Sequence, residues 1–153
     1  MTSLNRKQQG FTIVELLIVI VVIGILAGLV ITTFNGIQQK GRDTERQTDI
    51  KALHSQIEAY YAQNGSYPSL TDMNLSTFRT DNLKGLDEGA FKDPKGTATS
   101  LVGTTPAAGT YGYVYVTLPA SCTSATCTSY TLTTALEGKI DGATTYQKKS
   151  LNN

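Results

Sequence analysis

Residues 11–34 read FTIVELLIVIVVIGILAGLVITTF, and this stretch decides the fold of the 153-residue chain. Every residue from Leu16 to Ile31 is apolar or glycine, and only three threonines and Glu15 interrupt the apolar character of the longer stretch. At a rise of about 1.5 Å per residue, a helix of this length measures roughly 36 Å, which is enough to cross a bilayer. Because nothing later in the chain is comparably apolar, the sequence predicts one membrane-spanning helix near the N-terminus.

The ten residues before this stretch read MTSLNRKQQG, and Arg6 and Lys7 are their only charges. Positive charge holds a leader on the cytoplasmic side of a membrane and directs the following part of the chain outward. A secretory signal would combine a shorter apolar core, of about 7–15 residues, with a small-x-small cleavage site after it. Here the apolar run is longer and no Ala-x-Ala follows, so we expect a single-pass anchor with the rest of the chain outside.

Glu15 is the one carboxylate within the apolar stretch. On insertion scales, a charged side chain at the centre of a membrane helix costs about 2.5–3.5 kcal/mol, and less near the interface. The stretch contains no Lys or Arg that could be its partner. If the chain were cut after Gly10, however, Phe11 would gain a free α-amino group about 6 Å from Glu15 along the helix axis. That cation could pair with Glu15 of the same subunit or, better, with Glu15 of a neighbouring subunit.

The run from Gly10 to Ile20, GFTIVELLIVI, resembles the processing and assembly motif of the type IV pilins and pseudopilins. The resemblance implies that a prepilin peptidase cuts between Gly10 and Phe11, removing a leader of residues 1–10, and methylates the new amine. It gives Glu15 the role of guiding subunits into register as they polymerise into a helical filament. It also implies an assembly platform and a cytoplasmic ATPase motor, and passage from the cytoplasmic membrane to an extracellular pilus.

The function expected from this resemblance is structural, that of a pilin in a type IV pilus. A pseudopilin of a type II secretion or competence system would have the same N-terminal sequence features, and it is the alternative. A monomeric, membrane-anchored binding domain, which would keep Met1 and never polymerise, is a third and weaker interpretation.

After the membrane and polymerisation helix, residues 35–64 continue as a polar and then amphipathic spine. Ile50, Leu53 and Ile57 recur at spacings of three and four, which is one face of a helix with 3.6 residues per turn. We therefore expect the N-terminal helix to continue unbroken to about Ala62, with its second half packed on a globular head.

The head is predicted to comprise residues 65–153. A mostly irregular connection is expected over 65–108, with a short helical turn near 71–79, and a β-meander over 109–149. The predicted strands are residues 111–118, 130–136 and 143–148. In the first strand, tyrosines alternate with valines and Leu118, and the apolar face of the sheet is expected to cover the stripe on the helix. The fold class is therefore α+β, a long N-terminal helix packed on a small antiparallel sheet of about three strands.

Cys122 and Cys127 lie in a segment rich in Ser, Thr and Ala between two predicted strands. Their spacing is not that of a C-x-x-C motif, and zinc needs four ligands, whereas the only histidine, His54, lies far away on the helix. A disulfide formed in an oxidising extracellular compartment is the simplest interpretation.

The head shows no catalytic or phosphate-binding motif, so we expect no enzyme, no catalytic residue and no cofactor. Asp87, Glu88 and Asp93 could in principle ligate calcium from a loop. Their spacing does not fit an EF-hand, and solvated carboxylates without a bound metal ion are the favoured interpretation.

The charge balance argues against nucleic acid as the main partner, because 13 Lys and Arg face 12 Asp and Glu. Lys40, Arg42 and Arg46 form a basic cluster, but acidic residues interleave with it. We expect a solvated helix face at this cluster.

Overall fold

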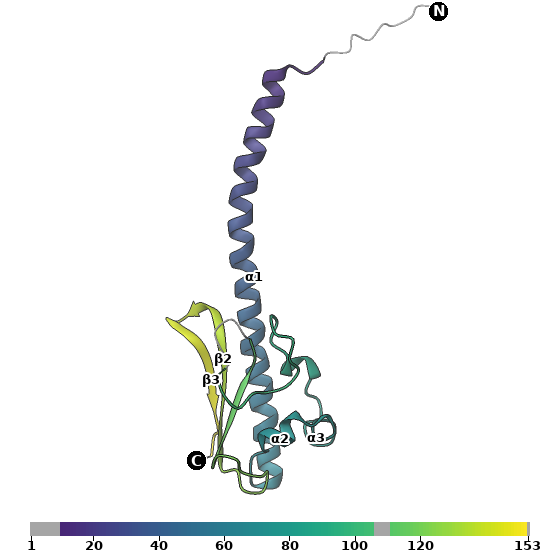
Figure 1. The fold of residues 1–153 in the computed structure, drawn as a ribbon, viewed down its shortest axis with the longest axis vertical. Helices are drawn as coiled ribbons and strands as arrows, with labels where there is room; N and C mark the ends of the chain where they lie inside the picture. The colour runs from purple at the N-terminus through teal and green to yellow at the C-terminus, as the bar shows by residue number, and fades with distance from the viewer. Residues whose placement is uncertain (1–9, 106–110, 153) are drawn as a thin grey trace, which may run out of the picture. The chain divides into compact units, whose positions relative to one another are not determined.

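The computed structural model describes residues 10–105 and 111–152, without the side chain of Thr32. The elements in chain order are α1 (Ile13–Asn64), α2 (Leu70–Asn74), α3 (Ser76–Asn82), a 3₁₀ turn (Glu88–Phe91), β1 (Val114–Leu118), β2 (Ser129–Ile140) and β3 (Ala143–Lys149) (Figure 1). The chain divides into two compact units, Met1–Gln38 and Gln39–Asn153, and the second unit is the head. The predicted leader, apart from Gly10, and the predicted start of the meander lie outside the described residues.

α1 is one continuous helix, as the sequence predicts, and it ends at Asn64 rather than at Ala62. Gly65 adopts a φ of +74°, the left-handed conformation that glycine takes without strain, and its N–H donates to the Tyr61 carbonyl at 2.7 Å. The Asn64 side chain donates to the Tyr60 carbonyl at 2.9 Å. These bonds occupy carbonyl groups that the end of a helix otherwise leaves unpaired.

The predicted antiparallel sheet is confirmed, with the strand order β1-β2-β3. β2 and β3 are joined through Asp141 and Gly142, whose φ values of +51° and +82° are those of a two-residue type I′ hairpin turn. β1 and β3 therefore form opposite edges of the sheet.

The stripe predicted on α1 is fully buried, but the sheet covers it with the other face of β1 from the one predicted. Val116 and Leu118, expected to face the helix, are 40% and 56% exposed. Tyr113 and Tyr115 are instead fully buried and belong to the core. The prediction of a valine-lined core face on this strand is therefore wrong.

The tyrosine face is the buried one because its hydroxyl groups find partners. The Tyr113 hydroxyl donates to Asp49 at 2.5 Å, and the Tyr115 hydroxyl donates to the Pro68 carbonyl at 2.7 Å. A tyrosine ring buries more apolar area than a valine, and a hydrogen-bonded hydroxyl removes most of the cost of burying its oxygen.

The connection between α1 and β1 is more ordered than predicted, because it forms α2, α3 and a 3₁₀ turn rather than one short turn. Figure 1 shows α2 and α3 near the end of α1 that carries Asn64. The Ser69 side chain caps α2 by accepting the Asp72 N–H at 3.1 Å. Met73 and Phe91 are buried in the core, so this segment is ordered because it covers the core.

Candidate functional site

α1 begins with reciprocal hydrogen bonds between Thr12 and Glu15. Thr12 Oγ1 accepts the Glu15 N–H at 3.2 Å. Glu15 Oε2 accepts both the Thr12 N–H, at 2.8 Å, and the Thr12 hydroxyl, at 2.7 Å. This arrangement is a capping box, which satisfies backbone donors that the first helical turn leaves unpaired. Glu15 therefore has a structural task at the start of the helix as well as a charge.

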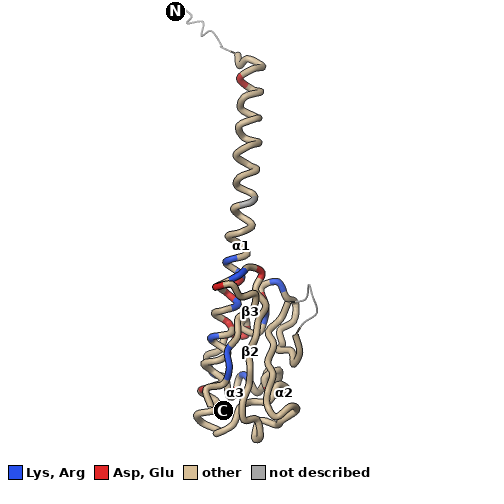
Figure 2. Tube along the Cα trace, turned by 90° about the vertical axis from the view of Figure 1, so that its left-hand side faces the viewer, with Lys and Arg blue, Asp and Glu red and all other residues tan. Residues whose placement is uncertain are grey.

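The first unit exposes a large apolar surface. Every large apolar side chain from Phe11 to Ile37 is between 48% and 89% exposed. No charged residue occurs from Leu16 to Gln39, the long uncharged part of α1 in Figure 2. Among the described residues, α1 is the one helix long and apolar enough to cross a membrane, by length and composition. A contiguous apolar surface of this kind marks a membrane-binding or protein-binding segment.

Glu15 carries its charge without an ion pair in the part of the chain that the structure describes. The next ionisable residue along α1 is Lys40. Phe11 and Gly10 immediately precede the capping box, and both are exposed, so the peptide bond between them is accessible. The predicted processing and assembly residues are thus neighbours at one end of the apolar surface.

Comparison with known proteins identifies the proteins that this region resembles. Residues 5–31 match the prokaryotic N-terminal methylation motif. The chain is 39% identical over 66 residues to the type II secretion system core protein G of Dickeya chrysanthemi, and 39% identical over 89 residues to that of Aeromonas hydrophila. It is 35% identical over 63 residues to the type IV major pilin protein PilA of Myxococcus xanthus. The chain is a homologue of pseudopilins and type IV pilins.

Each of these matches covers only part of the chain and part of the relative. They cover 43% of the chain and 43% of the Dickeya protein, 58% and 62% for Aeromonas, and 41% and 29% for Myxococcus. The chain thus spans about half the length of the curated relatives that it matches. No solved structure matches it. The resemblance seen in the run from Gly10 to Ile20 is confirmed by these relatives and by the motif.

In the head, Arg46 is the centre of a buried ion network that was not predicted from the sequence. Its fully buried guanidinium donates to Asp43 at 2.7 Å and to Glu137 at 2.9 Å. It also donates to both carboxylate oxygens of Asp93, at 2.8 and 2.9 Å. The prediction of a solvated helix face is therefore wrong at Arg46 and Asp43, because their partners come from distant parts of the chain.

Glu137, near the end of β2, binds three cations at once. Arg42 donates to its two oxygens at 2.6 and 2.7 Å, and Lys95 Nζ lies 2.7 Å from one of them. The bonds from Arg42, and then those from Lys95 and Arg46, hold the pKa of Glu137 well below its ordinary value of 4.5, although burial opposes them. The network therefore fixes β2 and the loop at Asp93 to α1.

The three carboxylates considered for calcium serve other contacts. Both oxygens of Asp93 bind Arg46, and Asp87 accepts a backbone N–H at 2.7 Å at the start of the 3₁₀ turn. Glu88 lies 3.4 Å from Arg79. Within the described residues, no group of three or more His, Cys, Asp or Glu is placed to hold a metal ion.

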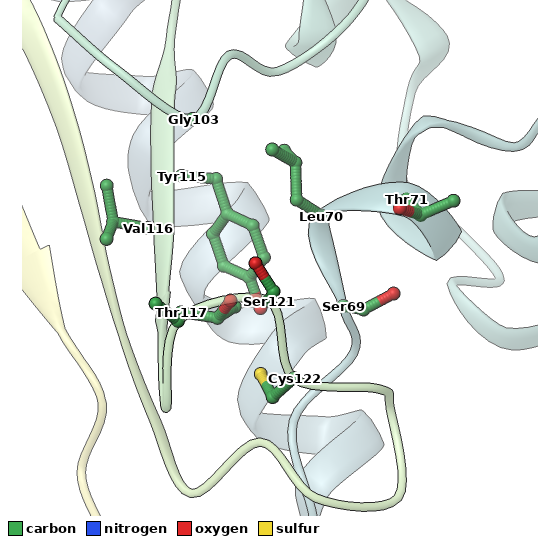
Figure 3. Close-up of a pocket in the computed structure, with 10 residues that line it drawn as sticks. Ser69, Leu70, Thr71, Gly103, Tyr115, Val116, Thr117, Ser121 and Cys122 are labelled. Atoms are coloured by element: carbon green, nitrogen blue, oxygen red, sulfur yellow. The ribbon is translucent and has the colours of Figure 1, made fainter.

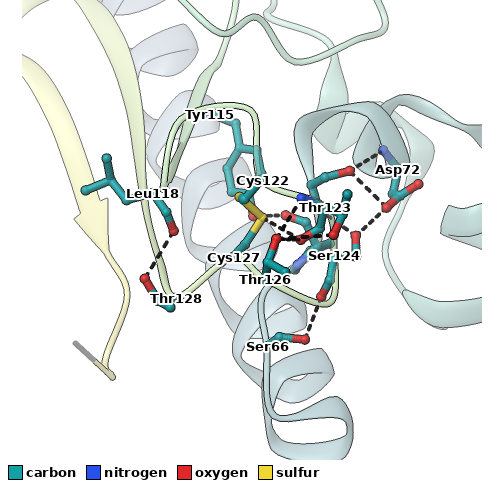
Figure 4. Close-up of a disulfide and its surroundings, with 12 residues drawn as sticks. Ser66, Asp72, Tyr115, Leu118, Cys122, Thr123, Ser124, Thr126, Cys127 and Thr128 are labelled. Carbon is teal, nitrogen blue, oxygen red and sulfur yellow. Dashed lines mark hydrogen bonds between the residues drawn. A yellow bond between two sulfur atoms is a disulfide. The ribbon is translucent and has the colours of Figure 1, made fainter.

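Cys122 and Cys127 form a disulfide between β1 and β2, with their Cα atoms 5.2 Å apart (Figure 4). The loop that they close is fixed to other elements by Ser124. The Ser124 hydroxyl donates to Asp72 of α2, and the Ser66 hydroxyl donates to the Ser124 carbonyl at 2.5 Å. The disulfide loop thus joins the β1–β2 connection to the segment that follows α1.

Replacing both cysteines by serine should lower the free energy of unfolding by about 2 kcal/mol, because the disulfide restricts the unfolded chain only over a short loop. The measurement is urea unfolding of the full chain in detergent, followed by tyrosine fluorescence. The parent chain under reducing conditions is the matched control and should show the same loss. A variant as stable as the oxidised parent would contradict the assignment of a stabilising disulfide.

A cavity of about 380 Å³ lies beside β1 and the disulfide, between Tyr115, Leu70 and Ser121 (Figure 3). None of the ten residues that line it is charged. His54 Nδ1 lies 2.7 Å from the buried Tyr130 hydroxyl and is hydrogen-bonded to it.

Proposed function

We propose that this chain is a structural filament subunit, a type IV pilin, that is cut after Gly10 and polymerises through the apolar part of α1. The observation that carries the proposal is Glu15, a carboxylate with no ion pair among the described residues, at the start of a helix whose large apolar side chains as far as Ile37 are all exposed. Such a surface needs cover by lipid or by other helices, and the charge needs a cation. A bundle of identical processed subunits supplies both.

Cleavage after Gly10 would create the cation, the α-amino group of Phe11, about 6 Å from Glu15 along the helix axis. Within one subunit, Glu15 is already hydrogen-bonded to Thr12, which favours the amine of a neighbouring subunit as its partner. In an apolar bundle, a paired carboxylate and amine are far more stable than either charge alone. Methylation of the amine would preserve its charge.

The mechanism has two states. Before assembly, the apolar helix anchors the chain in the cytoplasmic membrane by a single pass, with an anchoring free energy on the order of 5–10 kcal/mol and the head outside. In the filament, neighbouring helices replace lipid and the heads form the outer surface of an extracellular pilus. A prepilin peptidase, an assembly platform and an ATPase motor are the proposed partners. The subunit itself is proposed to be non-enzymatic and to need no cofactor.

A pseudopilin of a secretion system is the second candidate, and the similarity to core protein G of two type II secretion systems favours it. Both candidates are processed and polymerise. They differ in whether the filament extends beyond the cell envelope. Electron microscopy of cells that express the chain separates them. Long filaments on the cell surface support a pilin, and short structures confined to the cell envelope support a pseudopilin.

Processing predicts a defined mature mass. Intact-mass spectrometry of the membrane-extracted protein should show the loss of residues 1–10 and the gain of one methyl group. Gly10→Leu should leave the precursor uncut, because a large side chain would occupy the position before the cut bond, whereas Gln9→Ala should be processed like the parent. Retention of residues 1–10 in the parent, or a cut after Ile31, would refute the proposed function.

A further inference from the structure

Two opposite sides of α1 within the head carry opposite charges. Glu45 and Asp49 are four residues apart and therefore lie on one side of the helix. Lys51 comes two residues after Asp49, so it is rotated about 200° from it. We call Glu45 and Asp49 the acidic flank. Lys51, together with Lys148 of β3, is the basic flank.

The acidic flank lies at the β1 edge of the sheet. Asp49 accepts the hydroxyl of Tyr113, the residue immediately before β1, and Glu45 is exposed. Burial raises the pKa of Asp49, the bond from Tyr113 opposes the rise, and the negative charges of Glu45, Asp93 and Asp87 add to it. Glu45 and Asp49 thus repel each other on this side of α1, and a cation brought to the flank would relieve that repulsion.

The basic flank lies at the opposite, β3 edge, the side of the head that Figure 2 views. Lys51 Nζ lies 5.9 Å from the centre of the Tyr146 ring of β3, and the charge of Lys148 acts on His54. Neither lysine takes part in a salt bridge among the described residues. The carboxylate on this side, Glu58, already accepts two tyrosine hydroxyls and a backbone N–H. The basic flank is therefore not neutralised within the head.

We propose that the head of one subunit docks by its basic flank on the acidic flank of a second copy of this chain. The proposal rests on the proposed filament function and adds a contact between heads to the contact between apolar helices. Two lysines would meet two carboxylates, all four of them on regular elements, α1 and β3.

The placement of the charges selects the kind of contact. In a two-fold symmetric dimer, a flank would face its own copy, and like charges would oppose each other. When the basic flank of one subunit meets the acidic flank of the next, the first subunit keeps its acidic flank free and the second keeps its basic flank free. Such a heterologous contact repeats without closing and generates an open helical polymer. The charge pattern therefore favours a filament over a dimer.

The contact also fixes an offset between neighbours. Lys51 lies six residues beyond Glu45, so the two meet when neighbouring subunits are displaced by about 9 Å along the helix axis. The contact between Glu15 and the amine of Phe11 needs a displacement of about 6 Å. In the first contact, Glu45 of the neighbour lies level with Lys51 of the first subunit. In the second contact, Phe11 of the neighbour lies level with Glu15 of the first subunit. The two displacements have the same direction if the subunit that supplies Lys51 also supplies Glu15, and the length of a lysine side chain accommodates their difference.

The test is charge reversal in cells that produce this chain as their only pilin. Glu45→Lys and Lys51→Glu should each lower the yield of sheared filaments about tenfold or more, because like charges would then face each other at every repeated contact. The double variant should recover at least half of the parent's yield, because it restores opposite charges. Lys84→Glu, on the exposed turn after α3, changes the net charge as Lys51→Glu does and should assemble like the parent.

Each outcome decides the proposal. Single reversals that assemble like the parent would overturn it. A loss with Lys51→Glu that Glu45→Lys neither reproduces nor repairs would also overturn it, and would assign the basic flank to a different anionic partner such as nucleic acid or lipid. Mature mass and membrane level, measured in the same cells, show whether each variant is inserted and cut.

Parent filaments provide an independent measurement. Electron cryomicroscopy should place Lys51 Nζ within about 4 Å of the Glu45 or Asp49 carboxylate of an adjacent subunit. A separation of more than about twice that distance would overturn the contact. A parent chain that is cut and inserted but forms no filaments at all would overturn the proposed function itself, and the head contact with it.

Discussion

Glu15→Gln should abolish filament formation while leaving cleavage and membrane insertion intact. A glutamine at this position can still accept the N–H and hydroxyl of Thr12, because capping boxes form with Gln as well as with Glu. The substitution therefore removes the charge and keeps the start of the helix. Insertion should become easier, because the cost of placing a carboxylate in the bilayer disappears. What is lost is the ion pair with the amine of a neighbouring Phe11.

The measurement is the yield of sheared filaments from cells without other pilins, together with the level and mass of the subunit in the membrane. We expect a decrease of at least about a hundredfold in filaments, equivalent to roughly 3 kcal/mol per contact. Thr12→Val is the matched control, since it removes the cap and keeps the charge. It should cost about 1 kcal/mol at the helix start and reduce the yield far less. Normal filaments from Glu15→Gln would refute assembly by charge pairing.

Arg46→Met should lower the free energy of unfolding by about 3–5 kcal/mol, the cost of removing one partner from a buried ion pair. Methionine fills part of the space of the arginine, so the loss is mainly electrostatic. Asp43 and Asp93 would remain buried without their cation, and the contacts of Glu137 with α1 would be weakened. These carboxylates connect three separate segments of the head, so the effect should extend over the whole unit.

The measurement is denaturant unfolding of the full chain in detergent, followed by far-ultraviolet circular dichroism and tyrosine fluorescence. Arg42→Met is the matched control, because Arg42 binds the same Glu137 but its side chain is 26% exposed. A partly exposed pair contributes about 1 kcal/mol or less. Equal losses from the two variants would contradict a special role for the buried guanidinium.

The sequence was sufficient for the features that depend on hydrophobic periodicity. The length of the apolar run predicts α1, and the stripe of Ile50, Leu53 and Ile57 predicts the side on which the head packs. Alternation predicts the first two strands, and the short connections between the three predicted strands predict the antiparallel order. The N-terminal motif could also be recognised from the sequence, because Gly10, Phe11 and Glu15 lie within six consecutive residues.

Features that depend on distant partners were not predictable in the same way. The alternating pattern of β1 is compatible with either face packing on the core. The tyrosine face is buried because its hydroxyl groups bind acceptors on Asp49 and Pro68, which lie far away in the sequence. The buried Arg46 has the same origin, since Asp93 and Glu137 reach it from distant segments. One signal was present in the sequence. Arg46 lies four residues before Ile50, on the same face of the helix as the buried apolar stripe, and this position indicates a buried arginine.

The uncharged part of α1, from Leu16 to Gln39, has a mechanical consequence. Dispersion contacts between such helices have no preferred direction, so a small lengthwise slip of one subunit past another breaks no strong bond there. Resistance to pulling would come from the ends of this segment, where the charges are. A fibre made of these subunits should therefore stretch under tension before it breaks, and shorten again when released, as long as the terminal ion pairs hold.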